Sequence, residues 1–165
     1  MAHYAFIDEN NIVVEVIKGI DETDTEVLEE GETWEDHYGS FREGLTCLRT
    51  SYNTHRNEHL DGGTPFRGNY AGIGFSYDEE NDIFLHPKHY DSWVLDVETA
   101  GWKPPVDKPS DANVEMDTSA PVKNYDWDED TESWIVTGVF NYNSEEEIWE
   151  LEGAEGETEI IQLEE

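Results

Sequence analysis

The sequence predicts a mainly β protein: successive antiparallel hairpins forming a small sandwich or barrel-like core, with one short helix and a C-terminal β appendage. One spacing recurs four times along the 165 residues. In it, a large apolar residue and a following Asp or Asn precede a second large apolar residue, seven positions after the first. The polar runs between the apolar residues favour turns, because Asp and Asn side chains satisfy local backbone groups. Aromatic residues make up 12% of the chain, so we expect rings to supply much of the core.

These repeats predict four β-hairpins. The bracketing residues are Tyr77 and Phe84, Leu95 and Trp102, Trp127 and Trp134, and Tyr142 and Trp149. The first two hairpins lie in the stretch 70–102, around which we expect the rest of the chain to be organised. A recurring turn of one kind indicates a scaffold, and the chain carries no signal of comparable strength for catalysis.

Shorter elements precede the hairpins. YAFI and IVVEVI, separated by DENN, predict a first strand pair, and LTCLRT predicts a further strand. Between them, TWEDHYGSFR predicts a short helix with Thr33 as its N-terminal cap. The stripe expected to pack this helix on the sheet comprises Trp34, His37, Tyr38 and Phe41.

Composition divides the chain into three parts. Residues 1–103 are the predicted main β domain, with an irregular segment over 53–72. Residues 104–123 are a predicted linker or extended arm, because four of the six prolines lie between 104 and 121. Residues 124–165 are a predicted acidic β-hairpin appendage, with a last strand around 159–163.

Charge is the extreme feature of the composition. The chain has 41 acidic and 9 basic residues, for a net charge of −32. Nucleic acids and anionic membranes are therefore disfavoured as partners, because binding to phosphate requires clustered Lys and Arg. Such a charge favours solubility, and it suits either a basic partner surface or a saline medium that screens self-repulsion.

The charge is also unevenly distributed. Residues 1–40 hold twelve acids and one base, and residues from 124 onward hold fifteen acids and no Lys or Arg. Residues 41–75, which we call the neutral island, hold four arginines and three acids. We expect the island to contact an acidic flank, within the chain or in a partner.

Cys47 is the single cysteine, so an intrachain disulfide is excluded. Its place in LTCLRT indicates a small strand residue rather than a reactive thiol. The polar start MAHYAFIDENN predicts no signal peptide, and no run of about 18 apolar residues predicts a membrane span.

The motifs that could carry chemistry are weak. Residues 55–59 match the H-x-x-E-H string of a zinc-peptidase class, but they lie in loop-forming sequence, where the helix that the motif needs is not expected. An EF-type calcium loop starting at Asp126 fails, because Thr131 and Thr137 stand where Gly and Glu are needed. Weak calcium binding by Asp-rich hairpin tips stays open. We expect no catalytic residues, no structural metal and no cofactor.

Aromatic and arginine side chains are instead good candidates for contacts with a partner, because Trp, Tyr and Arg dominate protein interfaces. The candidate residues are Arg42, Arg49, Arg56, Arg67, Tyr70, Trp93 and Trp102.

Several segments resemble small virion structural proteins of marine tailed phages, those of cyanobacteria in particular. They are MAHYAFIDENNIVVEVI, RTSYNT with GGTPFRGNYAGIGFSYDEENDIFLHPKHYDSWVLD, and WVLD…W…PPV…P with YDWDEDTESWIV. The resemblance covers most of residues 1–136, and GGTPFRGNYAGIG is its most specific part. It implies a non-enzymatic part of the particle, assembled in the host cytoplasm and exposed on the virion exterior. A saline habitat would also suit the charge.

Within this class we expect a capsid-surface decoration or cement protein, because the chain is short, very acidic, and without coiled-coil heptads or fibre-type glycine repeats. The expected partner is the major capsid protein, or a tail protein as second choice, with multiple copies in a symmetric assembly. A tail-fibre or tail-adaptor subunit is the alternative within the class. A different alternative is a calcium-dependent glycan-binding module that uses Trp93, Trp102 and the Asp-rich tips. A small acidic enzyme or a nucleic-acid mimic would rest on charge alone.

Overall fold

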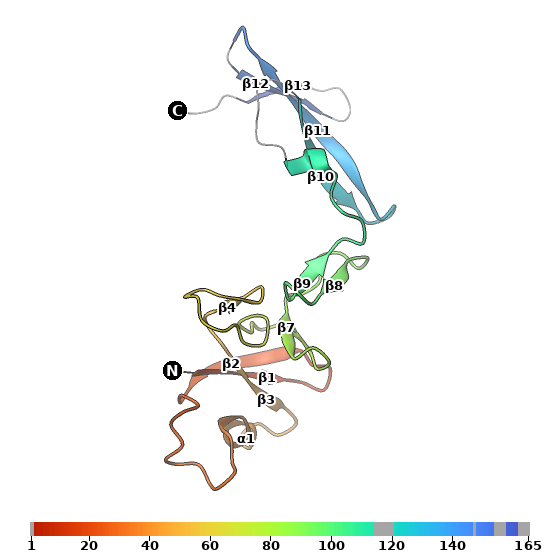
Figure 1. Ribbon diagram of the computed structural model, residues 1–165. Helices are drawn as coiled ribbons and strands as arrows, with labels where there is room; N and C mark the ends of the chain where they lie inside the picture. The colour runs from red at the N-terminus through yellow and green to blue at the C-terminus, as the bar shows by residue number, and fades with distance from the viewer. Residues whose placement is uncertain (1, 114–120, 147, 154–157, 162–165) are drawn as a thin grey trace. The chain divides into compact units, whose positions relative to one another are not determined.

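The computed structural model describes residues 2–113, 121–146, 148–153 and 158–161, and within them the chain is mainly β, as predicted (Figure 1). All strand pairs are antiparallel. The strands are β1 (Ala2–Ile7), β2 (Val13–Gly19), β3 (Thr46–Thr50), β4 (Thr54–His55), β5 (Glu58–His59), β6 (Ser76–Asp78), β7 (Ile83–Leu85), β8 (Val94–Asp96), β9 (Gly101–Lys103), β10 (Val122–Asp128), β11 (Ser133–Asn143), β12 (Ile148–Gly153) and β13 (Thr158–Ile161). The helices are α1 (Trp34–Gly39) and the 3₁₀ turn η1 (Ser110–Asn113). The described strands form several small sheets, and none of these sheets closes into a barrel.

The chain divides into two compact units. Unit 1 comprises Met1–His89 and Val94–Lys103, and unit 2 comprises Tyr90–Trp93 and Pro104–Glu165. Four residues ahead of β8 thus belong with the C-terminal part, a feature that composition did not indicate. No helix among the described residues is long and apolar enough to cross a bilayer.

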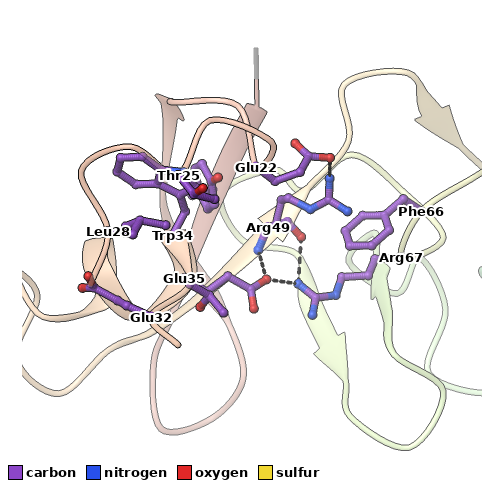
Figure 2. Close-up of a pocket in the computed structure, with 11 residues that line it drawn as sticks. Glu22, Thr25, Leu28, Glu32, Trp34, Glu35, Arg49, Phe66 and Arg67 are labelled. Atoms are coloured by element: carbon purple, nitrogen blue, oxygen red, sulfur yellow. Dashed lines mark hydrogen bonds and ion pairs between the residues drawn. The ribbon is translucent and has the colours of Figure 1, made fainter. Parts of the chain in front are cut away.

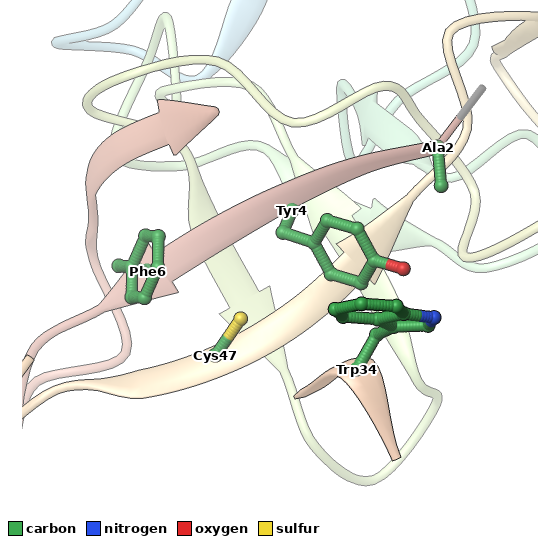
Figure 3. Close-up of a cluster of buried hydrophobic side chains, with 5 residues drawn as sticks. All are labelled: Ala2, Tyr4, Phe6, Trp34 and Cys47. Atoms are coloured by element: carbon green, nitrogen blue, oxygen red, sulfur yellow. The ribbon is translucent and has the colours of Figure 1, made fainter. Parts of the chain in front are cut away.

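The centre of unit 1 is the sheet β2-β1-β3, whose middle strand is buried on both faces. Alternation of side chains sends Tyr4 and Phe6 to one face, where they pack with Trp34 and Cys47 (Figure 3). The other face carries a second cluster of buried residues: Ala5, Ile7, Val13, Ala71 and Phe84. The sheet is therefore covered by α1 on one side and by the β6–β7 hairpin on the other.

Helix α1 begins where the sequence predicts. Thr33 and Asp36 form a capping box, in which each side chain accepts a hydrogen bond from the other's backbone nitrogen. Trp34 is buried against the sheet. The expected stripe is wrong at Phe41, because the helix ends at Gly39 and the Phe41 ring is 62% exposed.

All four predicted hairpins are confirmed, with the bracketing residues as direct cross-strand partners. The pairs are Tyr77 with Phe84, Leu95 with Trp102, Trp127 with Trp134, and Tyr142 with Trp149. In each turn, the Asp or Asn that follows the first bracketing residue accepts a hydrogen bond from another turn residue. For example, Asp78 Oδ1 accepts hydrogen bonds from the backbone nitrogens of Glu80 and Asn81, at 2.9 and 3.1 Å. The last turn residue has a positive φ in three of them, at Asp82, Ala100 and Glu132.

The segment predicted to be irregular, 53–72, is organised around buried Asn69. Its amide nitrogen donates to the carbonyl oxygens of Phe84 and Ala100, at 2.7 and 2.8 Å. Its Oδ1 accepts from the backbone nitrogen of Arg56 at 2.8 Å. One side chain thus joins this segment to the β6–β7 and β8–β9 hairpins.

Unit 2 is built on the meander β10-β11-β12-β13. The proline-rich arm packs on it: Trp134 Nε1 donates to the carbonyl oxygen of Val106 at 3.0 Å, and Lys108 Nζ lies 5.3 Å from the centre of the Trp134 ring. In η1, Asp111 accepts hydrogen bonds from Lys123 and Tyr125. Strand β10 starts at Val122, within the segment expected to be linker, and residues 114–120 lie outside the described part.

Candidate docking surface

Three of the four island arginines form ion pairs with acids of the same chain. Arg42 binds Glu15 through two contacts, Nε–Oε2 at 2.9 Å and Nη2–Oε1 at 3.1 Å. Arg49 pairs with Glu22. Arg67 pairs with Glu35 at 2.6 Å and with Asp82 at 2.7 Å. The expected contact between the island and an acidic flank therefore occurs within the chain.

Arg49 and Arg67 also line a pocket of about 390 Å³, which we call the arginine pocket (Figure 2). The Phe66 ring lies beside both guanidinium groups, whose carbons are 4.0 and 5.1 Å from its centre. Figure 2 shows the Glu35 carboxylate between the backbone nitrogen of Arg49 and the guanidinium of Arg67, with both hydrogen bonds at 2.6 Å.

The charged side chains of the arginine pocket form ion pairs with one another. Burial disfavours the charge on Arg67, but the hydrogen bond and charge of Glu35 outweigh burial and raise the arginine's pKa. Glu32 contacts His37 Nδ1 at 3.2 Å. The charged groups satisfy one another, so we assign this pocket a structural role.

A second hollow in unit 1 has a different character. It has a volume of about 420 Å³, and none of its lining residues is acidic. We call it the aromatic groove. The side chains that give it this character are Tyr52, His55, Leu60, Tyr70, Phe75 and His86. In a chain with 41 acids, a hollow lined by rings and without a carboxylate is a distinct surface.

The rings of the groove contact one another. Tyr52 and Tyr70 meet edge to face, with ring centres 5.5 Å apart. Phe75 and His86 are 4.2 Å apart, and His86 meets His55 at 6.0 Å. Burial lowers the pKa of His86, and the nearby charges of His55 and Arg56 lower it further.

Polar atoms on these rings face the surface of the groove. Within the described residues, the hydroxyls of Tyr52 and Tyr70 and the ring nitrogens of His55 and His86 have no hydrogen-bond partner. Two lining residues are largely exposed, Tyr52 at 65% and Leu60 at 67%, and so is Ile73, at 74%, which follows the lining residue Gly72. Aromatic and aliphatic area of this kind is typical of contact surfaces.

Backbone hydrogen bonds hold the walls of the groove in place. Tyr70 N donates to the carbonyl oxygen of Thr54, and Phe66 N donates to Thr54 Oγ1. Gly74 N donates to the carbonyl oxygen of Val13 in the central sheet. Gly72 is needed for close approach, because a Cβ there would lie 2.8 Å from Phe75 Cε1.

The remaining candidate residues fall in different places. Tyr70 lines the groove, and Trp102 Nε1 donates to the carbonyl oxygen of the groove residue His86 at 2.7 Å. Arg56 follows His55 and is exposed, and no ion pair of its guanidinium is found within the described residues. Trp93 belongs to unit 2, where its ring centre is 5.3 Å from that of Tyr90.

Sequence reasoning missed most of the groove, although one signal was present. The two longest stretches without Asp or Glu are residues 44–57 and 62–77. They supply four of its six characteristic side chains, Tyr52, His55, Tyr70 and Phe75. An acid-free stretch is conspicuous in so acidic a chain, and here it marks surface without carboxylates.

The H-x-x-E-H string does not form a helix. His55 and Glu58 are cross-strand partners in the β4–β5 hairpin. His59 Nδ1 accepts hydrogen bonds from the backbone nitrogens of Asp61 and Gly63, both at 3.1 Å. Across the described ranges, no cluster of three His, Cys, Asp or Glu side chains is arranged to hold a metal ion.

The carboxylates of the Asp-rich tip near Asp126 accept hydrogen bonds that form the turn. Asp128 accepts hydrogen bonds from the backbone of Asp130 and from the hydroxyl of Thr131. Glu129 accepts from both the backbone and the hydroxyl of Ser92, at 2.7 Å each, and from Trp127 Nε1 at 3.0 Å. These carboxylates hold the turn and the segment ahead of β8 together.

Comparisons with known proteins give no match: no family model fits the chain, and no curated protein and no solved structure is significantly similar to it.

Proposed function

We propose that this protein is a non-enzymatic structural protein of a tailed-phage virion, a decoration or cement protein on the capsid surface. It docks on the shell through the aromatic groove and the exposed side chains Tyr52, Leu60 and Ile73, which together we call the aromatic face. The class of protein rests on the sequence resemblance over residues 1–136. The observation that carries the docking surface is the contrast between a ring-lined groove without acidic lining residues and a chain of net charge −32.

Physical chemistry favours this face as the one that docks. Burying apolar area gains about 25 cal/mol per Å². Desolvating carboxylates carries a large penalty, which a groove without acidic lining residues avoids. The island arginines Arg42, Arg49 and Arg67 are engaged in ion pairs within the chain, so the aromatic face replaces them as the docking element. The acidic surface stays in solvent and keeps neighbouring particles apart by charge repulsion.

The proposal can be tested on particles of the phage that encodes the protein. Mass spectrometry of purified particles should detect it. Particles stripped at low salt, where self-repulsion is strongest, should rebind the purified protein in saline buffer. Leu60→Glu and Ile73→Glu should each weaken rebinding by about tenfold or more, because each buries a new charge at the interface.

Val27→Glu is the matched control, because Val27 is 67% exposed like Leu60 but lies in the acidic loop before α1. It should rebind as the unaltered protein does. Absence of the protein from purified particles would refute the proposal, and so would normal rebinding of both face variants. Particle reconstruction with labelled protein then separates the two locations: density over the shell supports a capsid protein, and density at the tail supports the tail-fibre or adaptor alternative.

A further inference from the structure

We infer that the aromatic groove binds an extended, proline-containing peptide segment without acidic residues, supplied by the partner protein. This inference rests on the proposed docking function and names the chemistry of the occupant. The groove is about 420 Å³, within the range of about 300–1,000 Å³ that is common for ligand sites.

The lining fits such a segment. Proline-rich peptides adopt the polyproline II conformation before binding, and they dock in grooves lined by aromatic side chains. Tyr52, Tyr70, Phe75 and His86 present ring surface along this groove. Because the walls are held by backbone hydrogen bonds to Thr54 and Val13, little ordering of the groove is needed on binding.

The hydrogen-bonding groups fit as well. The hydroxyls of Tyr52 and Tyr70 and the N–H groups of His55 and His86 are donors with no partner in the described chain. An extended peptide offers backbone carbonyl oxygens as acceptors, and proline adds no N–H that would need an acceptor. The groove therefore matches a carbonyl-rich segment.

The same lining argues against other ligand classes. No Lys or Arg lines the groove to bind a phosphate or carboxylate group. No carboxylate or carboxamide is present to accept hydrogen bonds from the many hydroxyls of a saccharide. A net charge of −32 repels an acidic segment and attracts one with a flanking Lys or Arg.

The test uses the full chain and two synthetic peptides, acetyl-Ala-Pro-Pro-Val-Pro-Lys-Pro-amide and the same peptide with every Pro replaced by Ala. Amide chemical shifts of the ¹⁵N-labelled protein report where each peptide binds. The Pro peptide should shift resonances of residues 52–60 and 70–75, with at least about fivefold tighter binding than the Ala peptide.

Tyr52→Phe and Tyr70→Phe remove only hydroxyl groups, so they keep the fold, and each should weaken binding about threefold or more. Tyr125→Phe is the control, because it removes a hydroxyl that bonds Asp111 in unit 2, and it should bind the Pro peptide normally. Equal affinity for the two peptides, shifts outside the groove, or hydroxyl variants that bind normally would each overturn the inference.

Two further outcomes would assign the groove to another occupant and overturn the inference. In the first outcome, the protein binds a neutral oligosaccharide on a glycan array, and Tyr70→Phe abolishes that binding. The other is a mass that doubles with protein concentration and returns to monomer with Leu60→Glu, which would indicate a second copy. The particle experiment distinguishes failure of the inference from failure of the proposed function. If Leu60→Glu abolishes rebinding but the peptide does not bind, only the inference is refuted. If the peptide binds but the protein is absent from particles, only the proposed function is refuted.

Discussion

The side-chain amide of Asn69 donates a hydrogen bond of 2.7 Å to the carbonyl oxygen of Phe84, and both residues are fully buried. Because the same amide also reaches the carbonyl oxygen of Ala100, Asn69 determines how the irregular segment meets two hairpins. The wall of the aromatic groove that carries Tyr70 begins at the next residue. The stability of the groove should therefore depend on this one polar side chain.

Asn69→Ala should lower the free energy of unfolding by about 2–4 kcal/mol, because it leaves buried carbonyl and N–H groups without partners. Urea titration followed by tryptophan fluorescence measures the change. Asn81→Ala is the control, since exposed Asn81 makes one side-chain hydrogen bond, to Asp78 Oδ2. A loss below about 1 kcal/mol for Asn69→Ala would contradict its role.

Arg67→Ala should destabilise unit 1 by about 2 kcal/mol, because the Arg67 side chain is only 14% exposed and its loss leaves Glu35 half-buried without its cation. The measurement is again urea unfolding. Arg42→Ala removes a two-contact ion pair that is about 40% exposed on both sides, and it should leave stability nearly unchanged. Equal effects of the two substitutions would show that burial does not decide the strength of these pairs.

Cys47 should react slowly with a thiol reagent at pH 8 in the folded protein and rapidly in urea. Burial, aided by the charge of Glu35, raises the pKa of its thiol to about 12, so the reactive thiolate is scarce. Because the folded pKa lies above the unfolded one, this contribution to stability is complete below about pH 8.5 and is lost as pH rises towards 12. Rapid labelling without denaturant would refute burial of Cys47.

Acid should destabilise the fold at high salt. Hydrogen bonds from Thr33, Asn81 and Ser92 lower the pKa of Asp36, Asp78 and Glu129, respectively. For groups whose folded pKa is depressed, stability is present above the unfolded pKa, near 4, and is lost as pH falls through the folded value. In about 1 M NaCl, which screens the general repulsion, Tm should fall between pH 5 and pH 2.5, and a Tm that stays constant or rises would contradict this.

Local structure followed closely from sequence. Each hairpin is specified within about ten residues, because an Asp or Asn forms the turn and the apolar residues around it pair across the strands. The Thr33 cap likewise depends on a residue three positions away. Phe41 was misplaced because helical spacing alone does not show where a helix stops, and here it stops at Gly39.

The contacts of the candidate residues could not be predicted from local sequence. Arginines predicted as partner contacts are joined to acids 27 to 32 positions earlier, as Arg42 is to Glu15 and Arg67 to Glu35. No local pattern specifies such pairs. The groove has the same difficulty. His86 meets Phe75 at the open end of the β6–β7 hairpin, but it reaches His55 only when that hairpin folds against the segment 53–72.

By itself, the sequence determined the β class, the four hairpins with their paired residues, the start of the helix and the acidic character of the surface. These are properties of neighbouring residues and of composition. Only the tertiary structure decided which arginines are neutralised, that Asn69 ties two hairpins to one loop, and that Tyr52, Tyr70 and His86 meet in one groove. The physical reason is that these contacts close long loops, and packing of the whole unit selects them from many alternatives of similar local energy.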